Sequence, residues 1–332
     1  MDDLSTSRRG FVAVAGLAAA AAAAGASPAA AQAQGAPPME SPTQRAGTYP
    51  RPPFPVQSQP FPGLTSRLNP RPDHGETSYR GSGKLAGMRA LITGGDSGIG
   101  RATAIAYARE GALVAINHLP YENPDAQELI EEMSAEGLRI VSIPGDLRDE
   151  RFCNRLIAQA RRELGGLNIL VNNAGRAQTR PSIEAITTED WDATMKTNIY
   201  APFWLTRAAV PDMRAGDVII NTTSALASIP IPDLVDYVLT KAAMLNFTGA
   251  MAKQLAPRGI RVNAVAPGLV WTPIHSAGGS TDSDYADLGR ISPMGRPAQP
   301  AEIAPLYVTA ADPLLSYSTG QIFAATGGSG QP

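Results

Sequence analysis

The sequence predicts an α/β fold, with a doubly wound parallel sheet of seven strands and helices on both of its faces. Three observations predict it. Short, almost continuously apolar runs recur along the chain, as in parallel strands that are buried on both faces. Longer amphipathic segments alternate strictly with these runs, which implies crossover connections between parallel strands. The first run leads directly into a glycine-rich turn and then into a helical segment.

The expected strands, in order, are the runs at 89–93, 113–117, 139–143, 168–173, 217–222, 260–266 and 321–325. They are rich in Val, Ile and Leu, as buried parallel strands are. The expected helices are 98–110, 124–136, 149–164, 189–213, 234–256 and 300–311. Because all these elements follow one another without a long interruption, residues 85–332 are expected to form a single domain.

Residues 1–33 are typical of an export signal. Arg8 and Arg9 supply a positive start, residues 11–24 form an apolar run, and small residues offer a cleavage site before Gln32 or Gln34. The apolar run is too short, and too rich in Ala and Gly, to span a bilayer. The order Ser-Arg-Arg-x-Phe-Val resembles the twin-arginine signal, whose machinery moves folded proteins. We therefore expect export to the periplasm by the twin-arginine translocation machinery, with no membrane segment after cleavage. The alternative is an Ala-rich helical tail with two incidental arginines.

Residues 34–84 form a proline-rich arm. Its stretch YPRPPFPVQSQPFPG shows neither helical nor strand periodicity. Such a composition favours extended, polyproline-like chain without a core of its own. We expect the arm to be a linker or to wrap over the surface of the domain.

Composition excludes several classes of protein. The net charge of −2 gives no broad basic surface for nucleic acid. The single Cys153 cannot form a disulfide within the chain. The three histidines, His74, His118 and His275, lack the spacing of metal ligands, so no metal site is expected.

The segment TGGDSGIG, residues 93–100, has the strand–turn–helix context of a dinucleotide-binding loop. Gly94 allows the sharp turn, Gly98 lets the backbone approach a pyrophosphate, and Gly100 lets the helix pack close to the sheet. Asp96 and Ser97 are expected in the loop or at the helix N-cap, with backbone contacts to the cofactor. The alternative is an ordinary glycine-rich loop between a strand and a helix.

Six motifs in order make the chain resemble the short-chain dehydrogenase/reductase family. They are the glycine motif with Thr93, Gly94, Gly98, Ile99 and Gly100, then NNAG at 172–175, Asn198 in KTNIY, Ser224, Tyr-x-x-x-Lys at Tyr237 and Lys241, and Pro-Gly-x-x-x-Thr at 267–272. The resemblance covers the chain from about residue 85 to its end and implies a Rossmann-type fold with NAD or NADP as cofactor. The sequence before the first strand resembles the arm of a bacterial subgroup of glucose or general-stress dehydrogenases.

Four residues are expected to carry the chemistry. Tyr237 and Lys241 are four residues apart on a predicted helix and therefore face the same way. A tyrosine titrates near pKa 10, and a neighbouring ammonium is expected to lower this pKa and favour the phenolate. The resemblance implies that Tyr237 is the general acid/base and that Lys241 also holds the nicotinamide ribose. It implies that Ser224 binds the substrate oxygen and that Asn198 holds a water in a proton relay to Lys241.

The resemblance assigns further contacts to the cofactor. Asp146 and Leu147 are expected beside the adenine. Asn173, Ala174 and Gly175 are expected along the cofactor, whereas Asn172 is structural or a contact. In the PGLVWT segment, Pro267, Gly268, Val270 and Thr272 are expected near the carboxamide or pyrophosphate, with Gly268 either a contact or a turn residue.

The choice between NAD and NADP depends on the end of the second strand. NAD enzymes often carry an acid there, and NADP enzymes an arginine. This chain has Asn117, His118, Leu119 and Pro120 instead. Glu122 is a candidate for the ribose and His118 for a 2′-phosphate. The absence of Arg or Lys favours NAD slightly.

The leading hypothesis is an exported oxidoreductase that interconverts an alcohol and a carbonyl on a small molecule. A narrower alternative is a sugar dehydrogenase of the glucose type, and a different one is a dinucleotide-binding sensor or scaffold without turnover. The loop 272–296 is expected to cover the site as a mobile lid, and Trp271 to line the pocket or to pack. The resemblance implies a homotetramer built through the helices at 189–213 and 234–256 and the last strand.

Overall fold

The computed structural model describes residues 47–330, and the predicted export signal lies outside the described residues. The strands form one sheet of seven parallel strands in the order β3-β2-β1-β4-β5-β6-β7. Their bounds are β1 Arg89–Thr93, β2 Leu113–His118, β3 Ile140–Pro144, β4 Ile169–Asn172, β5 Val218–Thr222, β6 Arg261–Pro267 and β7 Ile322–Ala325. The strand order reverses at β1, which pairs with β2 on one side and β4 on the other. In such sheets ligands bind at the carboxyl ends of the strands beside this reversal.

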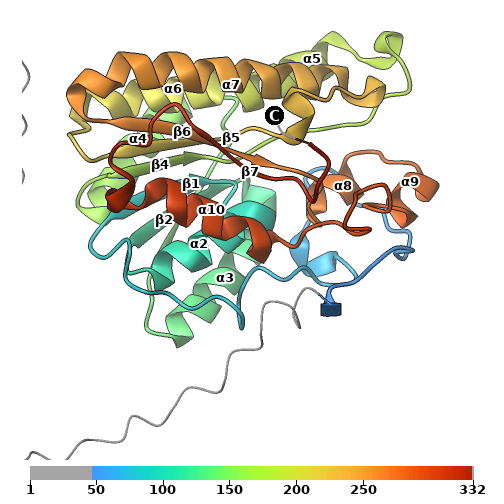
Figure 1. Ribbon diagram of the computed structural model, residues 1–332, viewed down its shortest axis with the longest axis horizontal. Coiled ribbons are helices and arrows are strands. Elements are labelled where there is room, and N and C mark those ends of the chain that lie inside the picture. The colour runs from blue at the N-terminus through green and yellow to red at the C-terminus, as the bar shows by residue number, and fades with distance from the viewer. Residues whose placement is uncertain (1–46, 331–332) are drawn as a thin grey trace, which may run out of the picture. The chain divides into compact units, whose positions relative to one another are not determined.

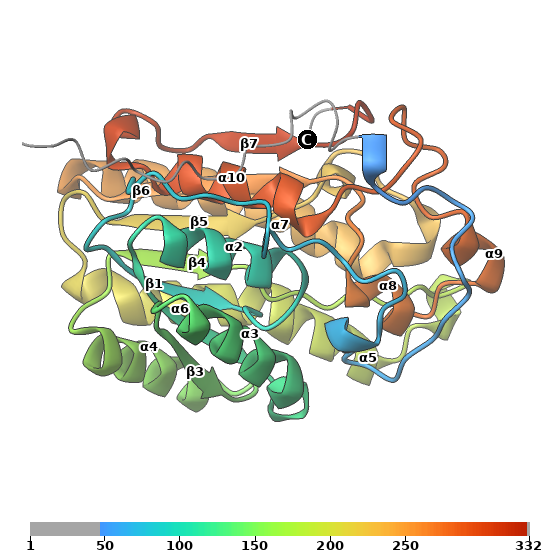
Figure 2. The ribbon, with the colours of Figure 1, turned by 90° about the horizontal axis from the view of Figure 1, so that it is seen from below.

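Helices cover both faces of the sheet, and the predicted fold is confirmed. Figure 1 shows α6 and α7 above the sheet and α2, α3 and α10 below it, and Figure 2 shows the lower layer from its own side. The helix bounds are α2 Gly98–Arg109, α3 Asn123–Ala135, α4 Glu150–Leu164, α5 Thr188–Met195, α6 Ala201–Ala209, α7 Val235–Leu255, α8 Pro273–Ala277, α9 Asp282–Ala286 and α10 Pro300–Ala311. None of the helices in the described residues is long and apolar enough to cross a membrane.

Two apolar cores lie on opposite faces of the sheet. Adjacent residues of β1 divide between them: Leu91 packs with α4 and α6, whereas Ile92 packs with α2 and α10. This division follows from the alternation of side chains along a strand. It also explains why each strand is apolar throughout, because both of its faces are buried.

The predicted helix 189–213 is interrupted. It consists of α5, a π-helical segment Lys196–Tyr200, α6 and a 3-10 turn Val210–Asp212. Pro202 has no backbone N–H and cannot donate to the carbonyl of Asn198 four residues earlier. The N–H of Ala201 donates to the carbonyl of Lys196 instead, five residues back. The result is the wide turn that carries Asn198, and such π-segments are frequent at functional sites.

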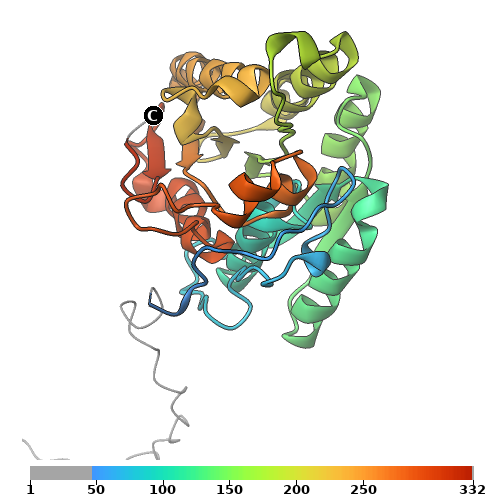
Figure 3. The same ribbon diagram turned by 90° about the vertical axis from the view of Figure 1, so that its right-hand side faces the viewer.

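The arm from Thr48 onward belongs to the same compact unit as the sheet. Phe54, Leu64 and Leu68 are buried. The ring of Phe54 stacks on Trp271 with centroids 4.3 Å apart, and the Trp271 indole donates a hydrogen bond of 2.8 Å to the carbonyl of Pro70. Figure 3 shows this blue arm running beside the orange α8 and α9. The few apolar residues of the arm are therefore buried against the domain. Trp271 is a packing residue.

Candidate active site

The glycine-rich loop has the geometry that a dinucleotide needs. Gly94 has φ +61° and Gly98 has φ +49°, backbone conformations that residues with a side chain rarely adopt. A Cβ on Gly100 would lie 1.8 Å from the carbonyl oxygen of Gly94, so only glycine permits this close approach of α2 to the turn. Ser97 occupies the N-cap position of α2 without a side-chain hydrogen bond. The first N–H groups of α2 and its dipole face this loop, a favourable arrangement for phosphate.

The loops after β1, β4 and β6 meet at the carboxyl edge of the sheet. A Cβ on Gly98 would lie 2.9 Å from Cγ2 of Thr272, and one on Gly94 would lie 3.1 Å from Cα of Ala174. Asn173 donates from Nδ2 to the carbonyls of Thr93 and Gly94 at 2.9 and 3.1 Å. These contacts bring three predicted cofactor segments together. Asn172 instead donates 2.8 Å to Asn221 in the core, a structural role.

Tyr237 and Lys241 lie on the first turns of α7 and face the end of β5. Lys241 Nζ donates 2.8 Å to the carbonyl of Thr222 and lies 5.4 Å from the centre of the Tyr237 ring. The hydroxyl of Thr223 donates 2.8 Å to the backbone carbonyl of Lys241. Ser224 follows directly, with its hydroxyl within hydrogen-bonding reach of Tyr237. The end of β5 thus fixes both ends of the Tyr-x-x-x-Lys pair.

Asn198 is held on the other side of Lys241. Its amide donates to the carbonyl of Arg176 and to Oγ1 of Thr240, at 2.9 and 3.0 Å, and its Oδ1 accepts 2.8 Å from the N–H of Arg176. A Cβ on Gly175 would lie 3.7 Å from Lys241 Nζ and 3.8 Å from Asn198 Oδ1. The structure therefore brings the four predicted catalytic residues to one place. Their chemical roles stay predictions.

The pKa of Tyr237 differs from the expectation. Burial raises it to about 12, against the opposing effect of the hydrogen bond with Ser224. Burial also lowers the pKa of Lys241 to about 8. The sequence-based expectation that the ammonium lowers the tyrosine pKa is wrong for this state of the protein, because Lys241 points its Nζ at the Thr222 carbonyl and the loss of solvent dominates.

Several predicted cofactor residues have their side chains engaged elsewhere. His118 is buried, with Nε2 2.7 Å from Ser142 Oγ and Nδ1 2.8 Å from the carbonyl of Leu119. Both ring nitrogens are occupied, so this side chain does not extend toward a 2′-phosphate. A Cβ on Gly268 would lie 2.8 Å from Cα of Thr326, which makes Gly268 a close-packed turn residue. Leu147 and Val270 are buried in the two apolar cores.

The remaining predicted contacts lie at or near the carboxyl edge of the sheet. Pro267 is the last residue of β6, and Ile99 lies partly buried at the start of α2. Asp146 follows β3 and is paired with Arg148 at 2.6 Å. Burial would raise the pKa of Asp146, but the hydrogen bonds from Arg148 outweigh it and lower the pKa.

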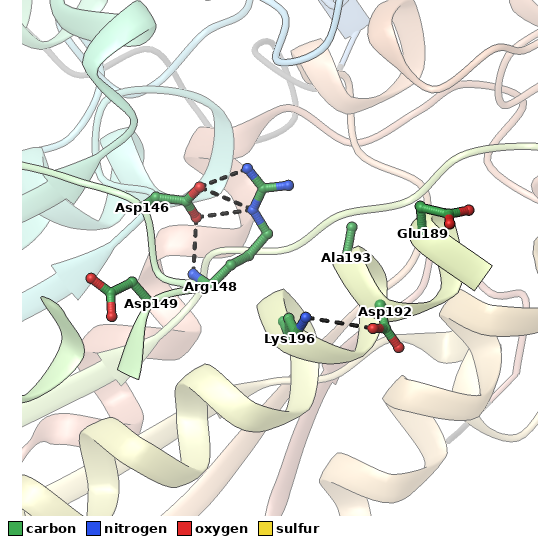
Figure 4. A pocket seen from close by; sticks show the side chains of 7 residues that line it. All are labelled: Asp146, Arg148, Asp149, Glu189, Asp192, Ala193 and Lys196. Atoms are coloured by element: carbon green, nitrogen blue, oxygen red, sulfur yellow. Dashed lines mark hydrogen bonds and ion pairs between the residues drawn. The ribbon is translucent and has the colours of Figure 1, made fainter. Parts of the chain in front are cut away.

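A cavity of about 430 Å³ lies beside this ion pair (Figure 4). Its lining residues are Asp146, Arg148, Asp149, Glu189, Asp192, Ala193 and Lys196. It therefore flanks the predicted adenine end of the site rather than the Tyr237–Lys241 pair.

Asp96 is buried in the glycine-rich loop. Neither of its carboxylate oxygens has a hydrogen-bond partner among the described residues. Burial raises the pKa of Asp96 to about 7. Burial and the charge of Asp96 raise the pKa of Glu122 to about 8. Asp96 and Glu122 thus form an acidic group after β1 and β2, whereas Asp125 on α3 accepts hydrogen bonds from the N–H groups of Thr65 and Ser66 in the arm.

The loop 272–296, predicted as a mobile lid, contains helices and is hydrogen-bonded to the arm. It contains α8 and α9, and the arm is hydrogen-bonded to both. The N–H of Gln59 donates 2.9 Å to the carbonyl of Ser276, and that of Phe54 donates 2.8 Å to the carbonyl of Ala286. We call residues 272–296 the substrate loop.

Sequence reasoning missed three residues of this site. Thr222 supplies the carbonyl that binds Lys241, Thr240 positions Asn198, and Arg176 is tied to Asn198 through its backbone. Backbone carbonyls leave no mark in a sequence, and Thr240 is marked only by its place inside the Tyr-x-x-x-Lys motif.

In the described part of the chain no group of three or more His, Cys, Asp or Glu residues could hold a metal ion. Cys153 is buried, and burial raises the pKa of its thiol to about 12. It is therefore a core residue and not a nucleophile.

Comparison with known proteins agrees with this geometry. The profile of a family described as enoyl-(acyl carrier protein) reductase matches residues 94–329. The chain is 50% identical to the oxidoreductase YhxD of Bacillus subtilis over 278 residues, covering 83% of this chain and 93% of that protein. It is 46% identical to general stress protein 39 of the same organism over 276 residues, covering 83% and 96%. The structure of a short chain dehydrogenase from Burkholderia cenocepacia in complex with NADP matches with a TM-score of 0.68 and 33% identity, over 74% of this chain and 98% of that one.

The fold and the site define a dinucleotide-dependent oxidoreductase with a Rossmann-type sheet. The chain belongs to the short-chain dehydrogenase/reductase family, as its motifs predicted, and is similar to the general-stress oxidoreductases of Bacillus. The tight glycine turn at 94–100 fits NAD or NADP, because Gly94 and Gly98 have positive φ and Gly100 lets α2 approach the turn closely, the backbone arrangement that a pyrophosphate needs.

Proposed function

We propose that this protein is an NAD(P)-dependent oxidoreductase that interconverts an alcohol and a carbonyl, with Tyr237 as general acid/base. One observation carries this proposal: Lys241 Nζ and Asn198 Oδ1 both lie within 4 Å of one point beside Gly175, with Tyr237 one turn before Lys241. A protein that only binds a dinucleotide does not need this arrangement, which argues against a sensor or scaffold.

The residues of the site divide the work. The nicotinamide of the bound cofactor supplies or accepts the hydride. Tyr237 Oη gives a proton to the carbonyl oxygen in reduction and takes it from the hydroxyl in oxidation. Ser224 holds the substrate oxygen beside it. Because the pKa of Tyr237 is about 12, the phenol is protonated at neutral pH and is ready to act as an acid.

The acidic group at the ends of β1 and β2 supports NAD as the cofactor. Asp96 and Glu122 follow β1 and β2 at the edge where we propose the adenosine ribose, and the negative charge that Asp96 gains above about pH 7 would oppose a 2′-phosphate there. The similar short chain dehydrogenase from Burkholderia is in complex with NADP, so the preference that we propose concerns the present chain alone. Dissociation constants of NADH and NADPH, measured by fluorescence, test it.

Export with the cofactor already bound remains our proposal for Arg8 and Arg9. The periplasm is not expected to supply free dinucleotide, and the twin-arginine machinery carries folded proteins. The arm supports retention of the cofactor, since it ties the substrate loop down at Ser276 and Ala286.

A homotetramer is supported by exposed apolar side chains. Tyr200 and Phe203, beside and on α6, and Leu239 on α7 are 48, 44 and 49% exposed, and Ile322 on the edge strand β7 is 40% exposed. The described part of the arm, from residue 47, leaves these faces open, which disfavours a monomer in which this part covers them. Light scattering at micromolar concentration should return four times the chain mass, and a monomer mass would refute the tetramer.

The decisive experiment for the activity starts from the purified protein. Mass spectrometry identifies the bound nucleotide, and a panel of aldehydes, ketones and sugars is then tested for turnover. Reduction of aldehydes supports the proposal, turnover of free sugars alone supports a sugar dehydrogenase, and nucleotide without any turnover supports the sensor.

A further inference from the structure

The segment after Gly175 carries two arginines along the edge of the active site. Gly175 abuts Lys241 Nζ, as described above. The N–H of Thr179 donates 2.6 Å to the carbonyl of Gly278 in the substrate loop, and the N–H of Arg180 donates 2.9 Å to the carbonyl of Asp233, shortly before α7. Residues 176–180 thus connect the catalytic lysine, the substrate loop and the turn that leads to Tyr237.

The two arginines share a single carboxylate. Arg176 Nη2 lies 2.7 Å from one oxygen of Asp190, and Arg180 Nη2 lies 2.6 Å from the other. Gln178 Oε1 accepts from both guanidiniums, at 2.6 and 2.8 Å. Two positive charges face one negative charge in this cluster, so one positive charge is in excess.

Arg176 also has an unused donor. The residue is 8% exposed, and its Nε is buried without a hydrogen-bond partner in the described residues. A buried donor left unpaired is costly, and most such groups in proteins are paired with protein or ligand. Burial lowers the pKa of Arg176, although Asp190 opposes this effect. The guanidinium therefore lacks a full set of acceptors.

The arm contacts this guanidinium. The ring of Phe61 lies 4.7 Å from the guanidinium carbon of Arg176, a distance typical of a cation–π contact. Asp190, Gln178 and Phe61 together hold the arginine in one place. This is the preorganisation that a specific ion-binding group requires.

We propose that Arg176, Arg180 and Gln178 form a subsite for a carboxylate on the substrate, so that this enzyme acts on carbonyl compounds that carry a negative charge. The inference rests on the proposed function and names its substrate class. Nη2 of each arginine already donates to Gln178 and Asp190, so the Nε of Arg176, unpaired in the described part of the chain, is the donor left for a substrate carboxylate. A hydrogen bond from a guanidinium to a carboxylate is charge-assisted and therefore stronger than a neutral one. A neutral sugar would leave the excess charge unpaired.

The test uses two ligands of nearly equal shape and different charge. Calorimetry measures the binding of benzoate and benzamide to the NADH-loaded full chain. We expect benzoate to bind about ten- to a hundred-fold more tightly, the range of a charge-assisted hydrogen bond. Arg176→Gln should remove this preference, and Arg155→Gln, an exposed arginine on α4, should retain it. If Arg176→Gln no longer binds NADH, Arg180→Gln replaces it as the test.

Two results would overturn the subsite. One is benzoate binding that is no tighter than that of benzamide, including the case that neither is detected. The other is a preference for benzoate that survives both arginine substitutions. Turnover is measured separately with 4-carboxybenzaldehyde and benzaldehyde. Turnover of both aldehydes at equal kcat/KM would contradict the subsite alone, whereas benzoate-selective binding without any turnover would contradict the proposed activity alone.

Discussion

Lys241 Nζ donates a hydrogen bond of 2.8 Å to the carbonyl oxygen of Thr222, the last residue of β5. This bond holds the lysine under the Tyr237 ring and away from solvent. It explains how an ammonium is kept in a buried place, although burial lowers its pKa to about 8. The free energy of unfolding therefore depends on pH through the protonation of Lys241.

Replacing Lys241 by Met should abolish turnover and weaken cofactor binding while making the fold more stable at neutral pH. Between pH 8 and 10.5 the unfolded chain holds a proton on Lys241 that the folded protein lacks, so the stability of the wild type rises with pH in this window. Below pH 8 the wild type must bury a charge that the variant lacks. Thermal unfolding at pH 7 and pH 10 measures this difference. Lys253→Met, an exposed lysine on the same helix, should change neither activity nor stability.

Asp96→Asn should stabilise the protein at pH 8 and have little effect near pH 4. The folded pKa of about 7 lies above the ordinary 3.8, so the wild type loses stability as pH rises between these values. The variant should also bind NADPH more tightly relative to NADH, because negative charge is removed. Glu131→Gln, which replaces an exposed acid on α3, is the control. It should change neither the stability nor the ratio of the NADPH and NADH dissociation constants. An unchanged ratio of the two cofactors in Asp96→Asn would contradict the electrostatic account of NAD preference.

Phe54→Ala should loosen the substrate loop. The ring is 5% exposed and stacks on Trp271, and loss of such a buried aromatic costs about 3–5 kcal/mol. We expect a lower unfolding temperature and faster release of bound NADH in stopped-flow measurements. Val56→Ala, an exposed arm residue, should behave as wild type. If Phe54→Ala unfolds at a lower temperature but releases NADH at the wild-type rate, the contact between the arm and the substrate loop does not retain the cofactor.

Replacing both Arg8 and Arg9 by Lys should block export. Cell fractionation followed by a nucleotide assay of the periplasmic material measures export and cofactor together. We expect wild-type protein in the periplasm with dinucleotide bound, and the variant in the cytoplasm. Unimpaired export of the variant would refute the twin-arginine assignment, and exported protein without nucleotide would refute export of the loaded enzyme.

The strands could be predicted to within one residue at each end, because burial on both faces makes each of them apolar throughout. The helix at 189–213 was predicted as continuous, since periodicity does not reveal a π-segment. Pro202 was the one local mark of the break.

The four predicted catalytic positions could be located in the sequence by their resemblance to the family motifs, whereas the pKa values of Tyr237 and Lys241 could not be predicted. The pKa of Tyr237 depends on burial and on where Lys241 points, and both follow from β5 packing against α7. The arm shows the same limit of prediction from sequence. Its composition indicates extended chain, but only the folded domain shows that Phe54 meets Trp271.

The most direct test of the proposed mechanism is a comparison of wild type with Tyr237→Phe at saturating cofactor. Hydride transfer is followed by NADH absorbance with the aldehyde that the wild type reduces best, and NADH binding is followed by fluorescence. The variant should lose about 10²–10⁴-fold in kcat, the usual contribution of a general acid/base, while its dissociation constant for NADH stays within a few-fold of wild type. Turnover by Tyr237→Phe at the wild-type rate would contradict the assignment of the proton transfer to this residue.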